Sequence, residues 1–344
     1  MSRNRGSARN ARGFTLIEVL LVCAIIGVVV ALTLAAVSHA RESARRLECS
    51  NRLRQHGAAL QSFVAVQSVF PAPMPARQPD RGKLWAMYDG LSGYFELMPY
   101  LELTTAYNAI NLGGGLLGPE NVENATVYHS SFSQFLCPSD GRSSRYDTGA
   151  NCFRFNVGSS NPNVERVGMP NHPERLGAFD VVSPLSPADY PDGLSSTVGM
   201  SERLLGGLSN GFDRRRDYWS AGVYPSFPVA TDDATLTTCR ALTGEPSSFI
   251  ADMGRSWMLG GAPYVWYNHV APPNQRFSDC ATGDGRTSMP FYCETCAISA
   301  RSNHSGGVNC LYMDGSVKFV TDGIDIKLWR ALGTRAGGEA VEPP

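Results

Sequence analysis

Gly13-Phe14-Thr15-Leu16-Ile17-Glu18 stands at the head of an apolar run that reaches Val37. Four arginines precede this run, and Glu18 is the only charged residue inside it. The run is about as long as the roughly 20 apolar residues that a bilayer-spanning helix needs. A carboxylate near the start of such a helix is costly in lipid, so it needs a specific partner. The stretch therefore predicts a membrane-anchored chain in which Glu18 has a defined role.

A basic segment followed by apolar residues is also typical of a secretory signal peptide or a plain membrane anchor. The apolar core of a signal peptide spans roughly 7–15 residues and ends at a small-x-small site. This run is longer, continues into helix-favouring sequence and contains a glutamate that a signal core does not use. These features disfavour an ordinary signal peptide.

The segment Arg12-Gly13-Phe14-Thr15-Leu16-Ile17-Glu18-Val19-Leu20 resembles the processing site of type IV prepilins and type II secretion pseudopilins. The resemblance implies that a prepilin peptidase removes residues 1–13 by cutting after Gly13 and methylates the new N-terminal Phe14. It also implies that Glu18, the fifth mature residue, pairs with the N-terminal amine of a neighbouring pilin-like subunit. Two charges that are each costly in lipid would then offset one another when subunits dock.

Residues 14 to about 66 contain no proline, which favours one long helix. We expect residues 14–37 to form its transmembrane half and residues 38–69 its amphipathic half. Within the second half, an apolar stripe recurs at helical spacing and predicts a buried face, formed by Leu53, Gly57, Leu60 and Val64. The simpler alternative is an anchor followed by a separate short helix. Prolines at 71, 73 and 75 end the helical segment.

The remaining sequence predicts a β-rich extracytoplasmic head over residues 70–336 and a short tail over 337–344. The chain has 35 glycines and 22 prolines, which favour a body rich in turns and loops. We therefore expect an α+β, pilin-like fold, with a long N-terminal helix packed on an antiparallel β-sheet head with long loops. Asp314-Gly315 predicts a two-residue type I′ hairpin turn that sets Tyr312 opposite Val317 and Cys310 opposite Phe319.

A second resemblance lies near the C-terminus, where nine residues separate His304 from Asp314-Gly315. This segment resembles the H-x9-DG motif of the DUF1559 family, a large bacterial family of uncharacterised prepilin-like proteins. Further segments match that family in the same order: Cys49 to Gln55, Phe135 to Asp140, Asp192 to Thr197 with Glu202, and Gly337 to Glu339. The chain departs from the family at His56, where an aliphatic residue is more usual, and in its extra Cys280, Cys293 and Cys296. The resemblance implies an architecture and a location but no reaction, cofactor or metal.

His304 and Asp314 could also form a catalytic acid–base pair. The alternative is that Asp314 is a turn residue and His304 a packing or capping group. We favour the alternative, because the hairpin already accounts for Asp314-Gly315. An unbroken ladder would place His304 opposite Asp325, although Gly306-Gly307 can interrupt it.

The chain has nine cysteines, of which Cys23 lies in the apolar run and is expected to stay a free thiol. The even number that remains is typical of an oxidising compartment. Our first pairing is Cys49 with Cys137, which would tie the helix to the head. The second is a group of local disulfides among Cys280, Cys293, Cys296 and Cys310. The same group with His304 has zinc-like spacing, but an exported chain favours disulfides.

These features predict a structural subunit of a type IV pilus or a type II secretion-like assembly, and not an enzyme. Its partners would be a prepilin peptidase, other pilin-like subunits and the inner membrane, which it would cross once. The head would lie in the periplasm or at the cell surface. A net charge of −1 gives no reason to expect a nucleic-acid partner. The alternatives are a ligand-binding or hydrolytic head near His304, or an anchored protein that never polymerises.

Overall fold

The fold is described here by a computed structural model, in which the cleavage residues Gly13 and Phe14, and also Cys293, lie outside the described residues. The chain divides into two units, residues 1–44 and residues 45–344. The structure describes residues 15–75, 90–112, 122–141, 148–158, 176–208, 211–220, 231–281 and 296–339.

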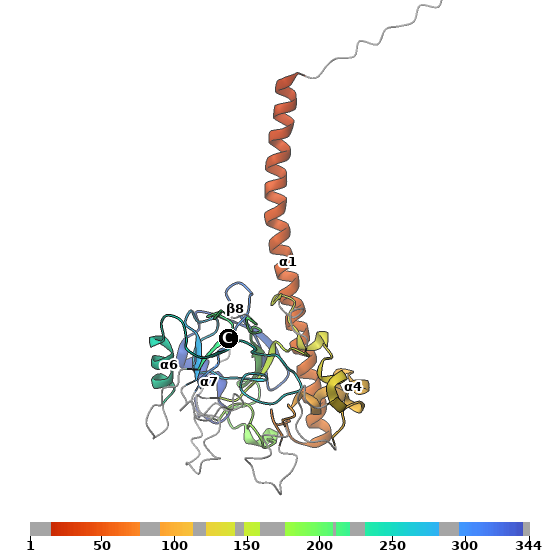
Figure 1. Cartoon of the computed structure of the whole chain (residues 1–344), viewed down its shortest axis with the longest axis vertical. Coiled ribbons are helices and arrows are strands. Elements are labelled where there is room, and N and C mark those ends of the chain that lie inside the picture. Colours follow the sequence, from red (N-terminus) through yellow and green to blue (C-terminus); the bar gives the residue numbers. More distant parts are fainter. Residues whose placement is uncertain are drawn as a thin grey trace, which may run out of the picture. The chain divides into compact units, whose positions relative to one another are not determined.

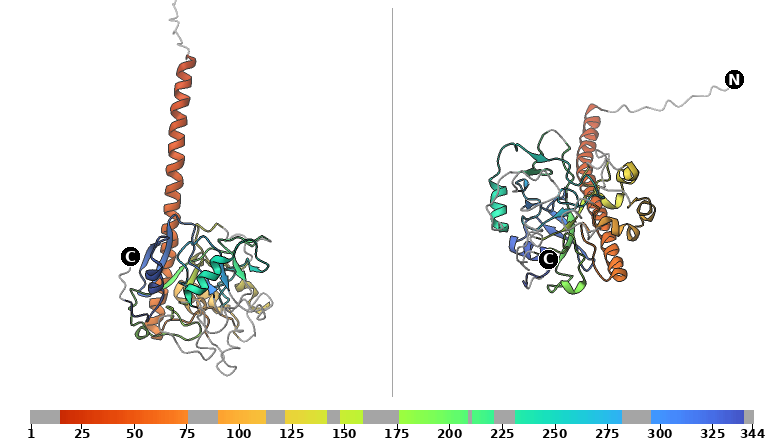
Figure 2. Two further views of the ribbon diagram at one scale, coloured as in Figure 1. Left: turned by 90° about the vertical axis from the view of Figure 1, so that its left-hand side faces the viewer. Right: turned by 60° about the horizontal axis from the view of Figure 1, so that its bottom comes forward.

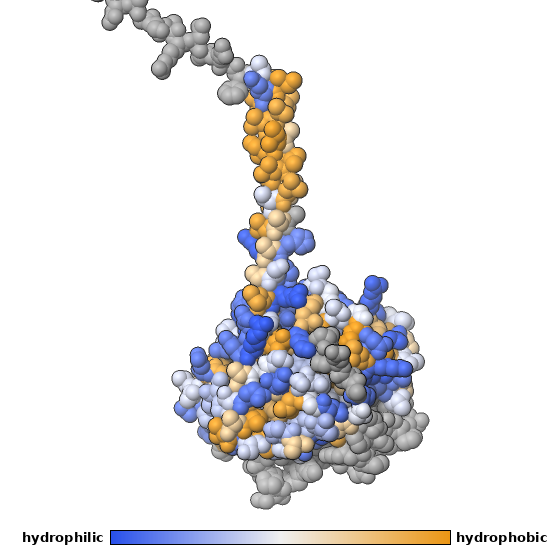
Figure 3. Space-filling model, turned by 180° about the vertical axis from the view of Figure 1, so that it is seen from behind, coloured by the Kyte–Doolittle hydropathy of each residue, from blue (hydrophilic) through white to orange (hydrophobic). Residues whose placement is uncertain are grey.

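Helix α1 spans Leu16–Gln67 without interruption (Figure 1). The prediction of one long helix is confirmed, and the alternative of an anchor plus a separate short helix is wrong. The most apolar 18-residue window of α1 has a mean hydropathy of 3.0, and none of it is buried. In Figure 3 apolar side chains cover the visible face of this first part of the helix. By length and composition it can cross a membrane.

The head contains two β-sheets, with strand orders β5-β1-β2-β8-β9 and β4-β3-β6-β7. β1 pairs with β5, and β3 with β6, in parallel. The sheets are therefore mixed, whereas the sequence predicted antiparallel pairing; long connections between partners permit the parallel pairs. The strands are β1 (Phe153–Asn156), β2 (Val198–Glu202), β3 (Tyr218–Ser220), β4 (Phe249–Ile250), β5 (Trp266–Tyr267), β6 (Asp279–Ala281), β7 (Cys296–Ala297), β8 (Gly307–Tyr312) and β9 (Val317–Thr321).

Short helices surround these sheets and complete the α+β layout that the sequence predicts. α6 packs on β6 and β7, and α7 packs on β2 (Figure 2). The α-helices are α3 (Tyr94–Leu97), α4 (Thr104–Asn108), α5 (Ala125–Tyr128), α6 (Asp232–Ala241) and α7 (Ile326–Gly333). The 3-10 helices are η2 (Met98–Leu101), η3 (Val122–Asn124), η4 (Ser133–Phe135) and η8 (Pro187–Asp189).

The second part of α1 is built into the core of the head. Leu53, Gly57 and Leu60 are buried and Val64 packs against them, as their helical spacing predicts. Burying one leucine side chain contributes about 2 kcal/mol, so this face stabilises the head substantially. The side-chain amide of Gln61 donates to the backbone oxygen of Met313, at 2.6 Å, and connects the helix to the β8–β9 hairpin.

That hairpin forms, but its turn differs from the predicted one. Leu311 pairs with Val317, and Cys310 pairs with Lys318 and not with Phe319. The loop is three residues long, Met313-Asp314-Gly315, and only Gly315 of the Asp-Gly pair has a positive φ, +89°. A three-residue loop with glycine in the left-handed region replaces the predicted type I′ turn and shifts the register by one residue.

Candidate functional site: a buried cysteine, glutamate and histidine cluster

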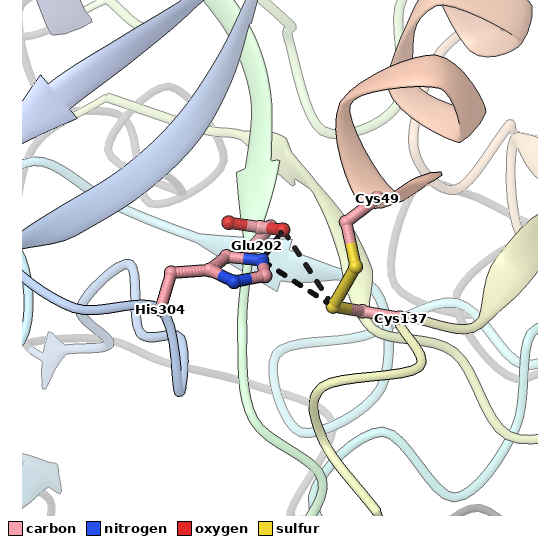
Figure 4. Close-up of side chains that lie close together, drawn as sticks. All are labelled: Cys49, Cys137, Glu202 and His304. Atoms are coloured by element: carbon pink, nitrogen blue, oxygen red, sulfur yellow. Dashed lines mark hydrogen bonds and ion pairs between the residues drawn. A yellow bond between two sulfur atoms is a disulfide. The ribbon is translucent and has the colours of Figure 1, made fainter. Parts of the chain in front are cut away.

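Four side chains from distant parts of the sequence meet inside the head (Figure 4). Cys49 comes from α1, and Cys137 follows η4. Glu202 is the last residue of β2, and His304 lies in the loop before β8. Their exposed fractions are 0%, 6%, 1% and 4%, respectively. The antiparallel pairing of β2 with β8 brings the last two residues together.

The four side chains are in direct contact. Cys49 and Cys137 form a disulfide, the pairing that the sequence analysis placed first. The Nε2 atom of His304 lies 3.1 Å from Oε1 of Glu202, where the imidazole N–H can donate to the carboxylate. Sγ of Cys137 lies 3.7 Å from each of these two atoms. One donor atom from each residue falls within a group whose members are all within 4.8 Å of one another.

Backbone and amide groups fix the carboxylate and the imidazole in place. Asn309 donates to Glu202 twice, from its backbone N–H at 2.8 Å and from its side chain at 3.1 Å. The hydroxyl of Ser302 accepts from the backbone N–H of His304 and donates to the oxygen of Gly307. Gly306, with a φ of +84°, closes this turn. The cluster is therefore a preorganised group of buried polar side chains.

The favoured interpretation of Asp314 as a turn residue is confirmed. The expected contact of His304 with Asp325 is wrong, because the carboxylate partner of His304 is Glu202. Asp314 accepts from the backbone N–H of Ser316 at 2.8 Å and so acts as a turn residue. Asp325 caps α7 by accepting from the backbone N–H groups of Lys327 and Leu328. Both aspartates thus have local structural roles that do not involve His304.

The suggested disulfide group is wrong for Cys280 and Cys310, two of its described members. Cys280 pairs with Cys239, which ties β6 to α6. Cys310 is a free, buried thiol in the other sheet, where it contacts the hydroxyl of Ser201 at 3.5 Å. Cys296 is disulfide-bonded. Sequence order suggested a shared site, but the strands that carry Cys280 and Cys310 belong to different sheets.

The free thiols of the described head, Cys152 and Cys310, are poor nucleophiles. Burial raises the pKa of Cys310 to about 12 and raises the pKa of Cys152 well above its usual range. Both therefore stay protonated near neutral pH, and the thiolate is the reactive form of cysteine. Cys23, the free cysteine in the apolar part of α1, is exposed along the helix surface.

Two other family-like segments contact each other at the C-terminal end of the head. The carboxylate of Asp192 accepts from the backbone N–H groups of Gly337 and Gly338, at 2.7 and 3.1 Å. Asp192 begins the segment that leads to β2, so this contact holds the start of the tail against the loop before that strand. The contact is structural and lies outside the cluster.

Glu18 has a local partner at the start of α1. Its carboxylate accepts from the backbone N–H and the hydroxyl of Thr15, at 2.8 and 2.9 Å. The backbone N–H of Glu18 donates in return to the hydroxyl of Thr15 at 3.3 Å. This reciprocal arrangement is a capping box, which satisfies two backbone donors at the helix start. In an isolated chain, Glu18 therefore caps its own helix.

A cavity of about 350 Å³ lies beside α7 and has both acidic and basic residues in its wall. His269 lines it, stacked on the ring of Trp329 with ring centroids 3.8 Å apart. Burial lowers the pKa of His269 to about 3, so this imidazole is neutral at physiological pH. The mixed charge of the wall, from Asp232, Lys327, Arg330 and Glu339, favours no particular class of ligand.

Each residue of the cluster lies in one of the segments that suggested the family resemblance, and this was the signal that could have located the site.

Residues 38–327 match the family described as "Protein of unknown function (DUF1559)". Residues 8–34 match the family described as "Prokaryotic N-terminal methylation motif". No curated protein matches the chain. No solved structure matches it.

Proposed function

We propose that this chain, which belongs to the DUF1559 family of proteins of unknown function, assembles with other pilin-like subunits through α1. Its N-terminal methylation motif and apolar helix support a prepilin-like, membrane-anchored subunit. A prepilin peptidase would cut after Gly13 and methylate Phe14. The assembly would be a type IV pilus or a type II secretion-like structure. The anchor would cross the inner membrane once, with the head in the periplasm or at the cell surface.

The observation that carries this proposal is the position of Glu18. It is the only charged residue of the apolar run and stands five residues after Gly13. A capping box alone does not require a carboxylate, since glutamine serves at that position as well. A full charge in lipid is better explained by an opposite charge that arrives when subunits dock. The N-terminal amine that cleavage creates would supply that charge.

We infer a structural role for the head as well. The carboxylate and imidazole of the buried cluster face a disulfide. In this form neither sulfur is a thiolate that could attack a substrate. The disulfides Cys49–Cys137 and Cys239–Cys280 suit an extracytoplasmic location, because such bonds persist in oxidising compartments.

The sharpest test separates the charge of Glu18 from its capping function. Glu18→Gln keeps a group that can accept from Thr15 but removes the charge. We expect this variant to insert in the membrane as the wild type does and to lose assembly, read by crosslinking of neighbouring subunits in intact cells. Thr15→Val, which keeps the charge and removes the hydroxyl of the cap, is expected to retain assembly.

Glu48→Gln is the matched control, since it removes an exposed carboxylate from the same helix outside the apolar run. It is expected to assemble normally. Normal assembly of Glu18→Gln would contradict the proposal and leave Glu18 as a helix cap. The mass of the purified chain tests processing separately, because cleavage removes residues 1–13 and methylation adds one methyl group to Phe14.

A further inference from the structure

The buried cluster presents a ligand set that matches a zinc site when its disulfide is open. Zinc is bound by cysteine sulfur, histidine nitrogen and carboxylate oxygen, in most structural sites by four ligands in a tetrahedron. Cys49, Cys137, Glu202 and His304 offer two sulfurs, one oxygen and one nitrogen, and all are buried. This cluster shares only His304 with the zinc-like spacing of the sequence, whose cysteines are Cys280, Cys293, Cys296 and Cys310.

The distances fit such a site. Tetrahedral zinc with Zn–S near 2.3 Å and Zn–N or Zn–O near 2.0–2.1 Å sets its ligand atoms about 3.4–3.8 Å apart. In the structure Cys137 Sγ lies 3.7 Å from His304 Nε2 and 3.7 Å from Glu202 Oε1, and the latter two atoms are 3.1 Å apart. His304 Nε2 and Glu202 Oε1, which are hydrogen-bonded, lie about 0.3 Å closer than this range and would move apart to admit the ion. The two sulfurs are closer still, because they are covalently joined. Their Cα atoms are 5.1 Å apart, and side-chain rotation can separate the sulfurs once the bond is broken.

We propose that Cys49, Cys137, Glu202 and His304 bind one Zn²⁺ ion when the two cysteines are in the dithiol form, and that the metal and the disulfide exclude each other. Cys49 belongs to α1 and the other three ligands to the sheets and loops of the head. The metal would therefore make the same helix-to-head connection before oxidation that the disulfide makes afterwards.

The chemistry balances with a dithiol as the reductant. The dithiol gives two electrons and two protons to the Cys49–Cys137 bond and becomes a disulfide, and the protein gains two thiols. Zn²⁺ then replaces both thiol protons, which pass to solvent, while the Nε2 proton of His304 shifts to Nδ1. The charge of the metal does not change. Oxidation by a disulfide reverses the electron transfer and releases the ion.

The groups around the cluster would position its ligands. Asn309 holds both oxygens of Glu202, and Ser302 accepts from the backbone of His304. Partners of this kind orient metal ligands and raise affinity, typically about 10–100-fold. Cys137 is the most exposed ligand at only 6%, so we expect loading to be coupled to folding of the reduced chain.

The test uses the full chain in detergent, folded with Zn²⁺ under dithiothreitol and compared with the air-oxidised chain. Zinc is counted by mass spectrometry after desalting, and Co²⁺ is substituted to detect thiolate-to-cobalt charge transfer and tetrahedral d–d bands. We expect about one tightly bound zinc in the reduced chain and none above background in the oxidised chain. Asn309→Ala is expected to weaken binding about 10–100-fold.

The reduced Cys49→Ser and His304→Gln variants are expected to lose the zinc. The double variant Cys239→Ser/Cys280→Ser removes the other described disulfide pair and is expected to keep it. The proposal is overturned if zinc stays in Cys49→Ser or His304→Gln, if the oxidised chain binds it equally, or if cobalt shows no thiolate bands. If a variant fails to fold, the reduced and oxidised wild-type chains decide: a reduced wild type without zinc, folded or not, rejects the site.

Discussion

The Nε2 atom of His304 lies 3.1 Å from Oε1 of Glu202, and their side chains are 0% and 2% exposed. The carboxylate also accepts the backbone and side-chain N–H groups of Asn309. Because all these donors are buried, the free energy of folding depends on the acceptor. A buried donor left without a partner costs about 1–3 kcal/mol.

Glu202→Gln is therefore expected to lower the free energy of unfolding by about 1–3 kcal/mol, because an NH₂ group replaces one of the accepting oxygens. Guanidinium denaturation of the oxidised chain measures this value. Glu48→Gln is the control, since Glu48 forms an ion pair with Arg52 but is half-exposed; its loss should stay within about 1 kcal/mol. Equal losses in the two variants would show that burial does not govern the effect.

The sequence predicted the features whose causes are local. The stripe Leu53, Gly57, Leu60 and Val64 marked the buried face of α1 because helical spacing alone defines it. The cluster could not be derived in this way. Glu202 and His304 are 102 residues apart and meet only through the pairing of β2 with β8. Nothing in the local sequence of either residue specifies the other.

The hairpin shows where local reasoning was insufficient. Asp314-Gly315 correctly marked the turn, but the same dipeptide fits a two-residue or a three-residue loop. The contact between α1 and the loop at Met313 is made in the folded head and not encoded in the dipeptide. The register therefore differed from the prediction: Phe319, expected opposite Cys310, pairs with Asn309 and lies beneath the guanidinium of Arg46.

Gly57→Ala is expected to destabilise the head by about 1–3 kcal/mol through overpacking. A Cβ at Gly57 would lie 2.8 Å from Cδ1 of Leu311 and 2.9 Å from the backbone oxygen of Gly315. In an unobstructed helix the same change would add stability, by roughly 0.8–1.0 kcal/mol. Thermal unfolding of the purified chain shows whether Gly57→Ala lowers or raises the stability of the head.

Gly27→Ala is the matched control in the same helix, because a Cβ at Gly27 meets nothing within 4 Å. It should leave the unfolding temperature of the head unchanged. An unchanged or raised unfolding temperature for Gly57→Ala would contradict the tight helix-to-hairpin contact.

His56 should make the head sensitive to acid. Burial lowers its pKa from 6.5 to about 4, against the hydrogen bond with the oxygen of Arg52. Between these values the unfolded chain binds a proton that the folded chain does not, so stability falls as the pH drops from 6.5 to 4. The shift corresponds to roughly 3 kcal/mol. His56→Leu removes this contribution. Between pH 7 and pH 4, the free energy of unfolding of the wild type should therefore fall by roughly 3 kcal/mol more than that of the variant.

The comparison with His56→Leu isolates His56 because His269, with a pKa lowered to about 3, contributes equally to both proteins. At pH 7 the variant should be at least as stable as the wild type, since Nε2 of His56 is buried and has no hydrogen-bond partner among the described residues. If the free energies of unfolding of the two proteins change equally with pH, His56 is not the acid-sensitive group.

Asp279 connects the two sheets through buried charge. Its carboxylate, in β6, forms ion pairs with Arg203, which follows β2, at 2.7 Å, and with Arg301 at 3.0 Å. Burial alone would raise the pKa of Asp279, but Arg301 and Arg203 outweigh it and hold the pKa below its usual value. Asp279→Asn removes the carboxylate that the two buried guanidinium groups share, which should cost about 3–5 kcal/mol.

Asp233→Asn is the control for Asp279→Asn, because Asp233 pairs with Arg330 at 2.7 Å but is 81% exposed. Its loss should cost no more than about 1 kcal/mol, since water screens the pair. Urea denaturation of both variants in low and high salt completes the test. Salt should reduce the small effect of Asp233→Asn and leave the large effect of Asp279→Asn unchanged, because ions reach only the exposed pair. A salt-sensitive loss at Asp279 would mean that the charged contact between the sheets is open to solvent.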